Sequence, residues 1–286
     1  MSPSRVLQVL FLTSVTCNAR ITDAERRNAF IGYSEKTRLV ENLPQKLDIE
    51  KLNSSEPILL SKTPCAYLLP QYISEQEATD LIEQANPRLR SQQFRDQPDT
   101  RTSWGATFYG QPESLTYQII KRSENMVQTA RSDGIEVKRY RVNEKYNSHH
   151  DYFSSPTNKL KNERVATFLI YLKTAEVGGE TMFPWAGGKE TIDPRTGWPY
   201  RPLDYNKECE PGTMPESALK VKVPTGSAVV FYSLHQNGTV DPYSQHGSCP
   251  VTEGEKWTAT VWTRATDAMN PSENWKTADL LARCES

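Results

Sequence analysis

Apolar residues recur at helical spacing in two segments of the first half of the chain. The first stripe consists of Ala78, Leu81, Ile82 and Ala85. Ser74 and Glu77 supply a capping box in front of it, and Pro87 ends the predicted helix. A second helix is predicted from about Pro112, and its stripe consists of Leu115, Ile119, Ile120, Met126, Val127 and Ala130. Both stripes are typical of helices that face a core.

Short apolar and β-branched runs follow from Ile135 onward, bounded by Gly, Pro and Asn, and they predict strands. The runs are IEVKRY at 135–140, VATFLIYL at 165–172, GSAVVFYS at 226–233 and WTATVWT at 257–263. The second run is apolar on both faces except at Thr167, which predicts a central strand covered on both sides. Helices followed by strands indicate an α+β fold, with the helices packed outside a β-sandwich or jelly roll.

Three segments fall outside this pattern. Residues 20–60 are polar and are predicted to form a stalk, and residues 266–286 form a polar tail. Residues 184–218 are rich in Pro and Gly and are too long for an ordinary connection between strands. They form either a partial lid or a solvated insertion, and we favour the lid because the segment begins directly after GGETMFP at 178–184. One catalytic domain over 61–265 is expected between the extensions.

Composition and charge exclude one class of partner. The 286 residues carry a formal net charge of −1, and the sequence pI is about 6.5. Because no strong basic field is present, nucleic acid is not an expected partner.

The N-terminus has the features of a secretory signal peptide over residues 1–19. Arg5 precedes an apolar run from Val6 to Cys17, which is too short to span a bilayer. An uncleaved membrane anchor at this end is the alternative. Cleavage leaves Cys65, Cys209, Cys249 and Cys284, an even number that suits two disulfides with three connectivities. Glycosylation sequons at Asn53 and Asn237 fit the same route through the endoplasmic reticulum and secretory pathway.

Candidate chemistry centres on His149, Asp151 and a distant His246. On a strand, His-x-Asp places both side chains on one face because successive residues alternate sides. Two imidazoles and one carboxylate bind one face of a ferrous ion and leave three positions open for chemistry. Lys256 adds a cation that could hold an acidic co-substrate. His150 would point to the opposite face, so we assign it no metal role.

The surroundings of these residues carry a family resemblance over about 65–263. The supporting stretches are PRLRSQQ at 87–93, RTSWG at 101–105, YRVNEKYNSHHDYF at 140–153, RVATFLIYL at 164–172, GGETMFP at 178–184, PTGSAVVFYSL at 224–234, DPYSQHGSCPV at 241–251 and HGSCPVTEGEKW at 246–257. In this order they resemble the α-subunit-like prolyl 4-hydroxylase family of Fe(II)- and 2-oxoglutarate-dependent dioxygenases. The resemblance implies a double-stranded β-helix (jelly-roll) core at about 135–264, with N-terminal helices packed outside the major sheet. It also implies hydroxylation of peptidyl proline at C4, with release of succinate and carbon dioxide.

The resemblance assigns roles residue by residue. His149, Asp151 and His246 correspond to the iron ligands, and Lys256 would bind the distal carboxylate of 2-oxoglutarate. Further pocket contacts would come from Tyr140, Thr181 and Trp262, and peptide contacts from Tyr146 and Arg164. Fe(II), 2-oxoglutarate, O2 and L-ascorbate are the implied cofactors and co-substrates. Departures from the family pattern are Asn143 in place of Gly, Gln245 in place of an apolar residue, and the long 184–218 insertion.

Several expectations follow from this set of residues. Cys209–Cys249 is the preferred disulfide because it would tie the insertion to the turn beside His246, and Cys249–Cys284 is the second choice. Proline-rich or collagen-like peptides are the expected substrates, and an aromatic groove could hold them. The candidate groove residues are Tyr146, Tyr152, Phe153, Trp185, Trp198 and Tyr243. Activity should decline below about pH 6, because ligating imidazoles must be neutral.

Three alternatives remain open at this stage. One is a related 2-oxoglutarate oxygenase that acts on a different residue or a small molecule. Another is a non-catalytic peptide-binding relative, and a third is a zinc hydrolase with the same ligands. The need for a partner subunit is unknown from the sequence.

Overall fold

The structure is a computed structural model, and it describes residues 56–129, 131–153, 163–189, 191–195, 197–199, 204, 207–210, 212–214, 218–265, 280 and 284. The predicted signal peptide at 1–19, nearly all of the stalk at 20–60 and most of the tail at 266–286 lie outside the described residues. Within the described ranges, no helix is long and apolar enough to cross a membrane.

Two antiparallel sheets organise the described part of the chain. The larger has the order β1-β2-β13-β7-β16-β5-β4-β3. Its strands are β1 (Ile58–Lys62), β2 (Cys65–Leu69), β3 (Arg90–Ser91), β4 (Trp104–Phe108), β5 (Arg131–Tyr140), β7 (Arg164–Lys173), β13 (Ala228–Tyr232) and β16 (Lys256–Arg264). The smaller has the order β12-β9-β14-β6. Its strands are β6 (Tyr146–His149), β9 (Thr181–Phe183), β12 (Leu219–Val221) and β14 (His246–Ser248).

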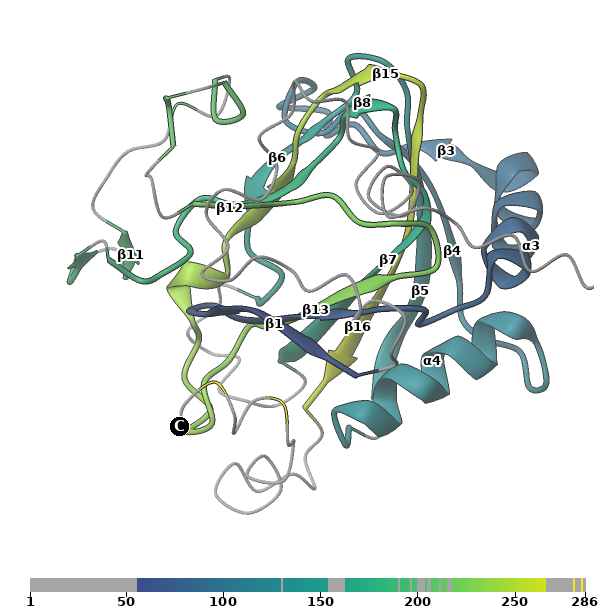
Figure 1. The fold of residues 1–286 in the computed structure, drawn as a ribbon, viewed down its shortest axis with the longest axis horizontal. Helices are drawn as coiled ribbons and strands as arrows, with labels where there is room; N and C mark the ends of the chain where they lie inside the picture. Colours follow the sequence, from purple (N-terminus) through teal and green to yellow (C-terminus); the bar gives the residue numbers. More distant parts are fainter. Residues whose placement is uncertain are drawn as a thin grey trace, which may run out of the picture.

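Two short antiparallel strand pairs accompany these sheets. β8 (Val177–Gly178) pairs with β15 (Val251–Glu253), and β10 (Ile192–Asp193) pairs with β11 (Trp198–Pro199). The β10–β11 pair lies in the insertion and projects away from the two sheets (Figure 1).

The two sheets pack face to face through an apolar cluster. Tyr171 and Phe231 of the larger sheet contact the cluster from one side, and Phe183 and Leu219 of the smaller sheet from the other. Burial of apolar surface between the sheets drives this packing. The sheet-rich antiparallel architecture confirms the main part of the fold-class prediction and agrees with a jelly roll.

Helices α3 (Glu75–Ala85) and α4 (Leu115–Met126) lie on one side of the larger sheet, and β12 and β6 lie on the other (Figure 1). Leu81 and Ile119 are fully buried in the same cluster as Val137, Ile170 and Val261 of the sheet. Most residues of the two predicted stripes therefore pack against the sheet, and Ala130 of the second stripe lies outside the described residues.

The predicted helix ends are largely confirmed. Ser74 Oγ accepts from the Glu77 N–H at 3.1 Å, and Glu77 Oε2 accepts from the Ser74 N–H at 2.7 Å, which completes the capping box. α4 begins at Leu115 rather than near Pro112, because Ser114 caps it by accepting from the Tyr117 N–H. Met126 was predicted to face the core but is 37% exposed, because it lies on the last turn of α4.

β7 occupies the centre of the larger sheet, between β13 and β16. This confirms the central strand predicted from its apolar run. Two residues near the smaller sheet have a positive φ that suits their residue type. Asn143 has φ 66°, which Asn tolerates. Gly178 has φ 74°, and a Cβ there would lie 2.4 Å from the Pro250 carbonyl oxygen.

The four remaining cysteines form the disulfides Cys65–Cys284 and Cys209–Cys249. The preferred pairing is therefore confirmed. The second choice, Cys249–Cys284, is wrong because Cys284 lies against β2, where its sulfur is close to the Tyr67 hydroxyl, whereas Cys249 follows β14 in the smaller sheet.

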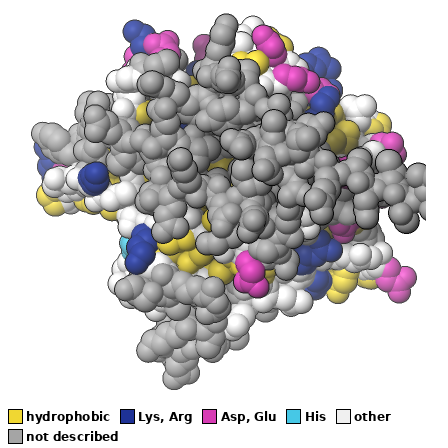
Figure 2. All heavy atoms as spheres, viewed as in Figure 1, with side chains coloured by type: hydrophobic (Ala, Val, Ile, Leu, Met, Phe, Trp, Pro, Cys, Tyr) yellow, Lys and Arg dark blue, Asp and Glu magenta, His cyan; other side chains and the backbone are white. Residues whose placement is uncertain are grey.

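Charges of both signs are interspersed around the rim of the face shown in Figure 2. This distribution fits the near-zero net charge of the chain.

Candidate active site

Three side chains converge at the open end of the space between the sheets. One nitrogen of His149, one nitrogen of His246 and one carboxylate oxygen of Asp151 all lie within 4.8 Å of one another. His149 Nε2 is 3.6 Å from Asp151 Oδ1, and His246 Nε2 is 3.5 Å from Asp151 Oδ2. In the part of the chain that the structure describes, this is the single cluster of His, Cys, Asp and Glu with metal-binding geometry.

Backbone carbonyls fix how the two imidazoles are presented. His149 Nδ1 lies 2.9 Å from the Asn147 carbonyl oxygen, and His246 Nδ1 lies 3.0 Å from the Ser244 carbonyl oxygen. Each carbonyl requires an N–H donor, so each ring carries its proton on Nδ1 and directs the Nε2 lone pair towards Asp151. The donor set therefore fits a divalent metal with the residues already in place.

The local structure at Asp151 differs from the prediction. β6 ends at His149, so Asp151 lies in the bend after the strand rather than on it. Thr167 of β7 holds its carboxylate instead, through a hydrogen bond from Oγ1 to Asp151 Oδ2 at 2.7 Å. The two residues come together because Thr167 points into the space between the sheets, on the same side as the metal site.

The surroundings set the protonation of this cluster. Desolvation, followed by the neighbouring imidazole, lowers the pKa of His149 to about 3, and desolvation also lowers the pKa of His246. Burial alone would raise the pKa of Asp151, but the two imidazoles and the Thr167 hydroxyl hold it below its usual range. Burial therefore favours the neutral, ligating form of both imidazoles, and the decline in activity below about pH 6 stays a prediction.

His150 takes no part in the cluster, which agrees with its assignment. Its Nε2 lies 2.9 Å from the Pro242 carbonyl oxygen, and its ring packs against Tyr152.

Lys256 lies at the closed end of the same cavity, where its side chain is 2% exposed. Its Nζ donates to Ser248 Oγ at 2.9 Å and to Thr181 Oγ1 at 3.3 Å. No carboxylate forms an ion pair with it among the described residues, and desolvation lowers its pKa to about 7. Glu180 partly offsets this lowering of the pKa, and the ammonium donates only to hydroxyl groups, so it is suited to an anionic ligand.

Alternate residues of β16 form one wall of the cavity between Lys256 and the metal cluster. Lys256, Thr258, Thr260 and Trp262 are alternate residues of β16, and all line the cavity. Tyr140 of β5 pairs with Lys256 in register and lines the same end. Thr181 comes from β9 on the opposite sheet. Tyr140, Thr181 and Trp262 all line the cavity, with Trp262 towards the metal cluster, and their contacts with 2-oxoglutarate stay a prediction.

Tyr146 and Arg164 lie at the mouth of the cavity. The Tyr146 ring stacks on His149 with centroids 3.8 Å apart, and the Arg101 guanidinium lies 4.7 Å from the Tyr146 ring centroid. Arg164 donates to Asp133 Oδ2 at 2.8 Å and lies 4.1 Å from the centroid of the Trp262 ring. Their contact with a peptide stays a prediction.

The other aromatic residues proposed for the groove lie in different surroundings. Trp185 is 2% exposed and donates its indole N–H to Gln245, so it belongs to the core. The same bond explains the polar Gln245 next to His246. Phe153 lies near Arg164, with the guanidinium 5.0 Å from its ring centroid. The side chain of Trp198 lies outside the described residues.

The insertion contributes no residue to the cavity wall among those described in 184–218. The partial lid therefore stays a prediction.

Sequence reasoning missed several residues of the cavity. Lys138 is buried, donates to Thr260 Oγ1 at 3.0 Å and pairs with Glu136 at 2.7 Å. The available signal was the alternation of the polar residues Glu136, Lys138 and Tyr140 within the strand predicted at 135–140. Thr167 had a signal of the same kind, as the one polar residue in VATFLIYL. Ser248 gave none, because its role depends on the distant Lys256.

Comparison with known proteins places this geometry in a family. Residues 135–264 match the family model described as the 2OG-Fe(II) oxygenase superfamily. The chain is 35% identical over 242 residues to Probable prolyl 4-hydroxylase 9 of Arabidopsis thaliana, covering 79% of this chain and 78% of that protein. It is 34% identical over 215 residues to Prolyl 4-hydroxylase 13 of the same plant, covering 72% and 73%.

Among solved structures, the chain is similar to the viral collagen prolyl hydroxylase of Paramecium Bursaria Chlorella virus-1 in its 2OG complex. The match has 20% identity and a TM-score of 0.49, and it covers 71% of this chain and 97% of that one.

Proposed function

Because this chain belongs to the prolyl 4-hydroxylase family of 2OG-Fe(II) oxygenases, we propose that it hydroxylates peptidyl proline at C4 and couples this to conversion of 2-oxoglutarate to succinate and carbon dioxide. The observation that carries the proposal is the convergence of His149, Asp151 and His246 in one cavity with the buried cation Lys256. A zinc hydrolase would leave Lys256 unexplained, whereas a dianionic keto acid gives its charge a partner.

The role that we assign to each residue follows from its place in the cavity. His149 Nε2, His246 Nε2 and the Asp151 carboxylate would hold the iron, which when bound supplies the activation of dioxygen for C–H oxidation. Lys256, with Thr181 beside it, would bind the distal carboxylate of 2-oxoglutarate. Tyr140 closes this end of the cavity, where its ring centroid lies 5.5 Å from Lys256 Nζ. The fixed Nδ1 protons keep both imidazoles in the metal-binding tautomer throughout the reaction.

Substrate positioning belongs to the mouth of the cavity. Tyr146 presents an aromatic ring beside His149, and Arg164 presents a guanidinium held by Asp133. A proline-rich segment in an extended left-handed helix has little conformational entropy to lose and packs well on aromatic surfaces. We assign Tyr146 and Arg164 to peptide contacts, with proline-rich or collagen-like sequences as the substrate class.

The remaining assignments concern the cell and the cofactors. The N-terminal signal pattern, the two disulfides and the exposed sequon residue Asn237 support a glycoprotein of the endoplasmic reticulum or secretory pathway. Membership of the 2OG-Fe(II) oxygenase superfamily supports the assignment of dioxygen as co-substrate and of ascorbate as the reductant that restores iron(II).

Incubation of the purified chain with poly-proline and collagen-like peptides, iron(II), 2-oxoglutarate and ascorbate tests the function. We expect succinate release in a one-to-one ratio with a gain of one oxygen on the peptide, located at proline C4 by fragmentation and NMR. The Asp151→Asn variant is the control for the metal cluster and should release no succinate.

Two results would redirect the proposal. Succinate release without oxygen on any proline would point to another residue or a small molecule as substrate. Peptide binding without succinate release by the iron-loaded wild-type chain would point to a non-catalytic binding module.

A further inference from the structure

The strand that carries His149 contains a β-bulge beside that residue. β6 pairs with β14 through His149 with His246 and through Tyr146 with Ser248, so two residues of β6 lie opposite Gly247 alone. A bulge takes backbone groups out of the ladder and redirects the side chains next to it. The N–H of Ser148, one of the two bulged residues, therefore needs a partner outside the sheet.

That partner is the carboxylate of Glu208, which comes from the insertion. Ser148 N donates to Glu208 Oε1 at 3.0 Å, across 60 positions of sequence. Glu208 is 5% exposed, and its Oε2 makes no hydrogen bond within the described part of the chain. Burial raises the pKa of this carboxyl to about 7. A buried carboxyl with so few partners is unfavourable by itself, so other contacts must hold the segment in place.

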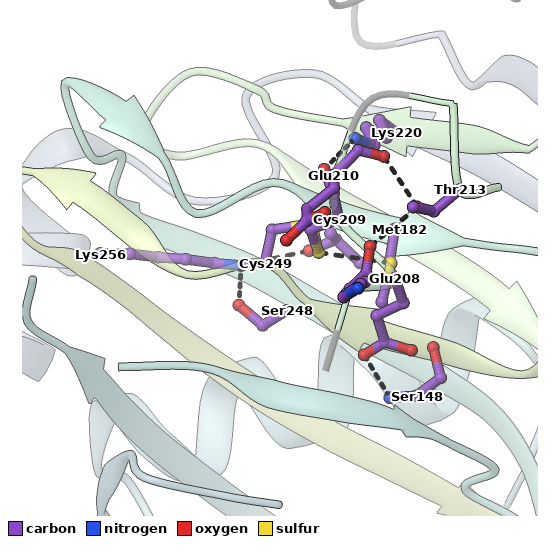
Figure 3. Close-up of a disulfide and its surroundings, with 12 residues drawn as sticks. Ser148, Met182, Glu208, Cys209, Glu210, Thr213, Lys220, Ser248, Cys249 and Lys256 are labelled. Atoms are coloured by element: carbon purple, nitrogen blue, oxygen red, sulfur yellow. Dashed lines mark hydrogen bonds between the residues drawn. A yellow bond between two sulfur atoms is a disulfide. The ribbon is translucent and has the colours of Figure 1, made fainter. Parts of the chain in front are cut away.

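Two contacts hold it, both at the next residue. Cys209 forms the disulfide with Cys249, and its carbonyl oxygen accepts from Lys220 Nζ at 2.9 Å. Cys249 directly follows Ser248, whose hydroxyl accepts from Lys256 (Figure 3). Figure 3 shows the disulfide between two hydrogen bonds of the site. On one side Glu208 accepts from Ser148, and on the other Lys256 donates to Ser248.

We propose that Glu208 is a positioning residue of the metal site. By accepting the Ser148 N–H it fixes the bulge and thereby the direction of His149, and the Cys209–Cys249 disulfide keeps Glu208 in this position. The insertion thus acts on the metal site through the strand that carries one ligand. The inference rests on the proposed function in one respect, that the cluster binds a divalent metal.

Titration calorimetry with Mn²⁺, in the absence of 2-oxoglutarate and peptide, tests the proposal. Glu208→Ala should raise the Kd for Mn²⁺ by about 10–100-fold, the usual loss when a residue that orients a ligand is removed. Glu208→Gln should stay within about threefold of wild type, because its amide oxygen still accepts the Ser148 N–H. The matched control is Glu210→Ala, which removes an exposed carboxylate from the same segment and should leave the Kd unchanged.

A double-mutant cycle separates positioning from a general loss of structure. Cys209→Ser with Cys249→Ser should weaken Mn²⁺ binding, and adding Glu208→Ala should cost little more, because both changes remove the same hydrogen bond. Hydrogen exchange at the Ser148 amide should rise in each of these variants while exchange in β7 and β16 stays slow. This measurement also serves on the reduced wild-type protein if the Glu208→Ala variant does not fold.

Each outcome bears on a separate claim. Tight Mn²⁺ binding by folded Glu208→Ala, or an unchanged Ser148 exchange rate after reduction of the disulfide, would overturn the positioning role. Failure of the wild-type protein to bind Mn²⁺ would instead overturn the metal site and with it the proposed function.

Discussion

Polar residues in the interior of this protein have two separate tasks, and their partners distinguish them. Lys138 is neutralised by Glu136 at 2.7 Å, whereas Lys256 has hydroxyl groups beside it. Both are buried, yet only the second has a charge that a ligand could still neutralise. The sequence assigned Lys256 to an acidic co-substrate but gave no role to Lys138, because the pairing of Lys138 with Glu136 is visible only in the folded strand.

Removal of the Lys256 charge should mainly affect the co-substrate. Lys256→Ala should raise the KM for 2-oxoglutarate by about 100-fold or more, because a buried anion would lose its paired cation at a cost of roughly 3–5 kcal/mol. Lys256→Arg should have a smaller effect, since it keeps the charge but changes its shape. Steady-state kinetics with varied 2-oxoglutarate measures both. Lys173→Ala, which removes an exposed lysine from the end of β7, is the control and should match wild type.

The pKa of Lys256 predicts a pH dependence of co-substrate binding. Desolvation lowers this pKa to about 7, so the side chain is protonated below pH 7 and increasingly neutral above it. Only the protonated form attracts the carboxylate, so the Kd for 2-oxoglutarate should rise about tenfold per pH unit above 7. Binding at pH 8.5 should take up a proton, which calorimetry in buffers of different ionisation enthalpy detects. A Kd that is constant from pH 7 to 9 would contradict the assignment.

At the scale of single elements, local sequence determined the helices well and the short strands poorly. The capping box at Ser74 and Glu77 and the cap at Ser114 lie within a few residues of the helices that they begin. The strands of the smaller sheet are three or four residues long, and their pairing joins segments from four separate parts of the chain. Such short strands carry little periodicity, so their register depends on tertiary contacts.

The capping box of α3 offers a test at this scale. Ser74→Ala should lower the free energy of unfolding by about 1 kcal/mol, because the Glu77 N–H loses its acceptor at a helix N-terminus. The melting temperature should fall by roughly 2–4 °C, and the KM for 2-oxoglutarate should not change. Glu83→Gln, on the exposed side of the same helix, provides the reference. A large loss of activity in Ser74→Ala would mean that α3 acts on the site as well as on stability.

Across the whole molecule, the two disulfides serve different ends. Cys65–Cys284 closes a segment of 219 residues at β2, remote from the metal cluster in sequence and in contacts. Cys209–Cys249 closes 40 residues and lies beside Ser248 of the cavity wall. A long closed loop restricts the unfolded chain most, so the first disulfide should contribute chiefly to stability.

Replacement of Cys65 and Cys284 by Ser should therefore lower the free energy of unfolding by about 2–5 kcal/mol. Denaturant titration measures this loss, and the Kd for Mn²⁺ and the KM for 2-oxoglutarate should remain those of the wild type. Replacement of Cys209 and Cys249 by Ser should differ in that it raises the Kd for Mn²⁺. Equal effects of the two pairs on metal binding would show that neither acts locally.

The sequence by itself determined the ligand types, the Lys256 cation, the capped start of α3 and the central strand β7, because these depend on residue chemistry and on periodicity over a few turns. It also indicated the Cys209–Cys249 pair, although the other pairing could be read only from the fold. The tertiary structure decided what holds each of these residues. The bend that carries Asp151 to Thr167, the carbonyls that set both imidazole tautomers and the carboxylate of Glu208 on the Ser148 amide all join distant or irregular segments. Such contacts depend on how two sheets face each other, and no local pattern of residues records that.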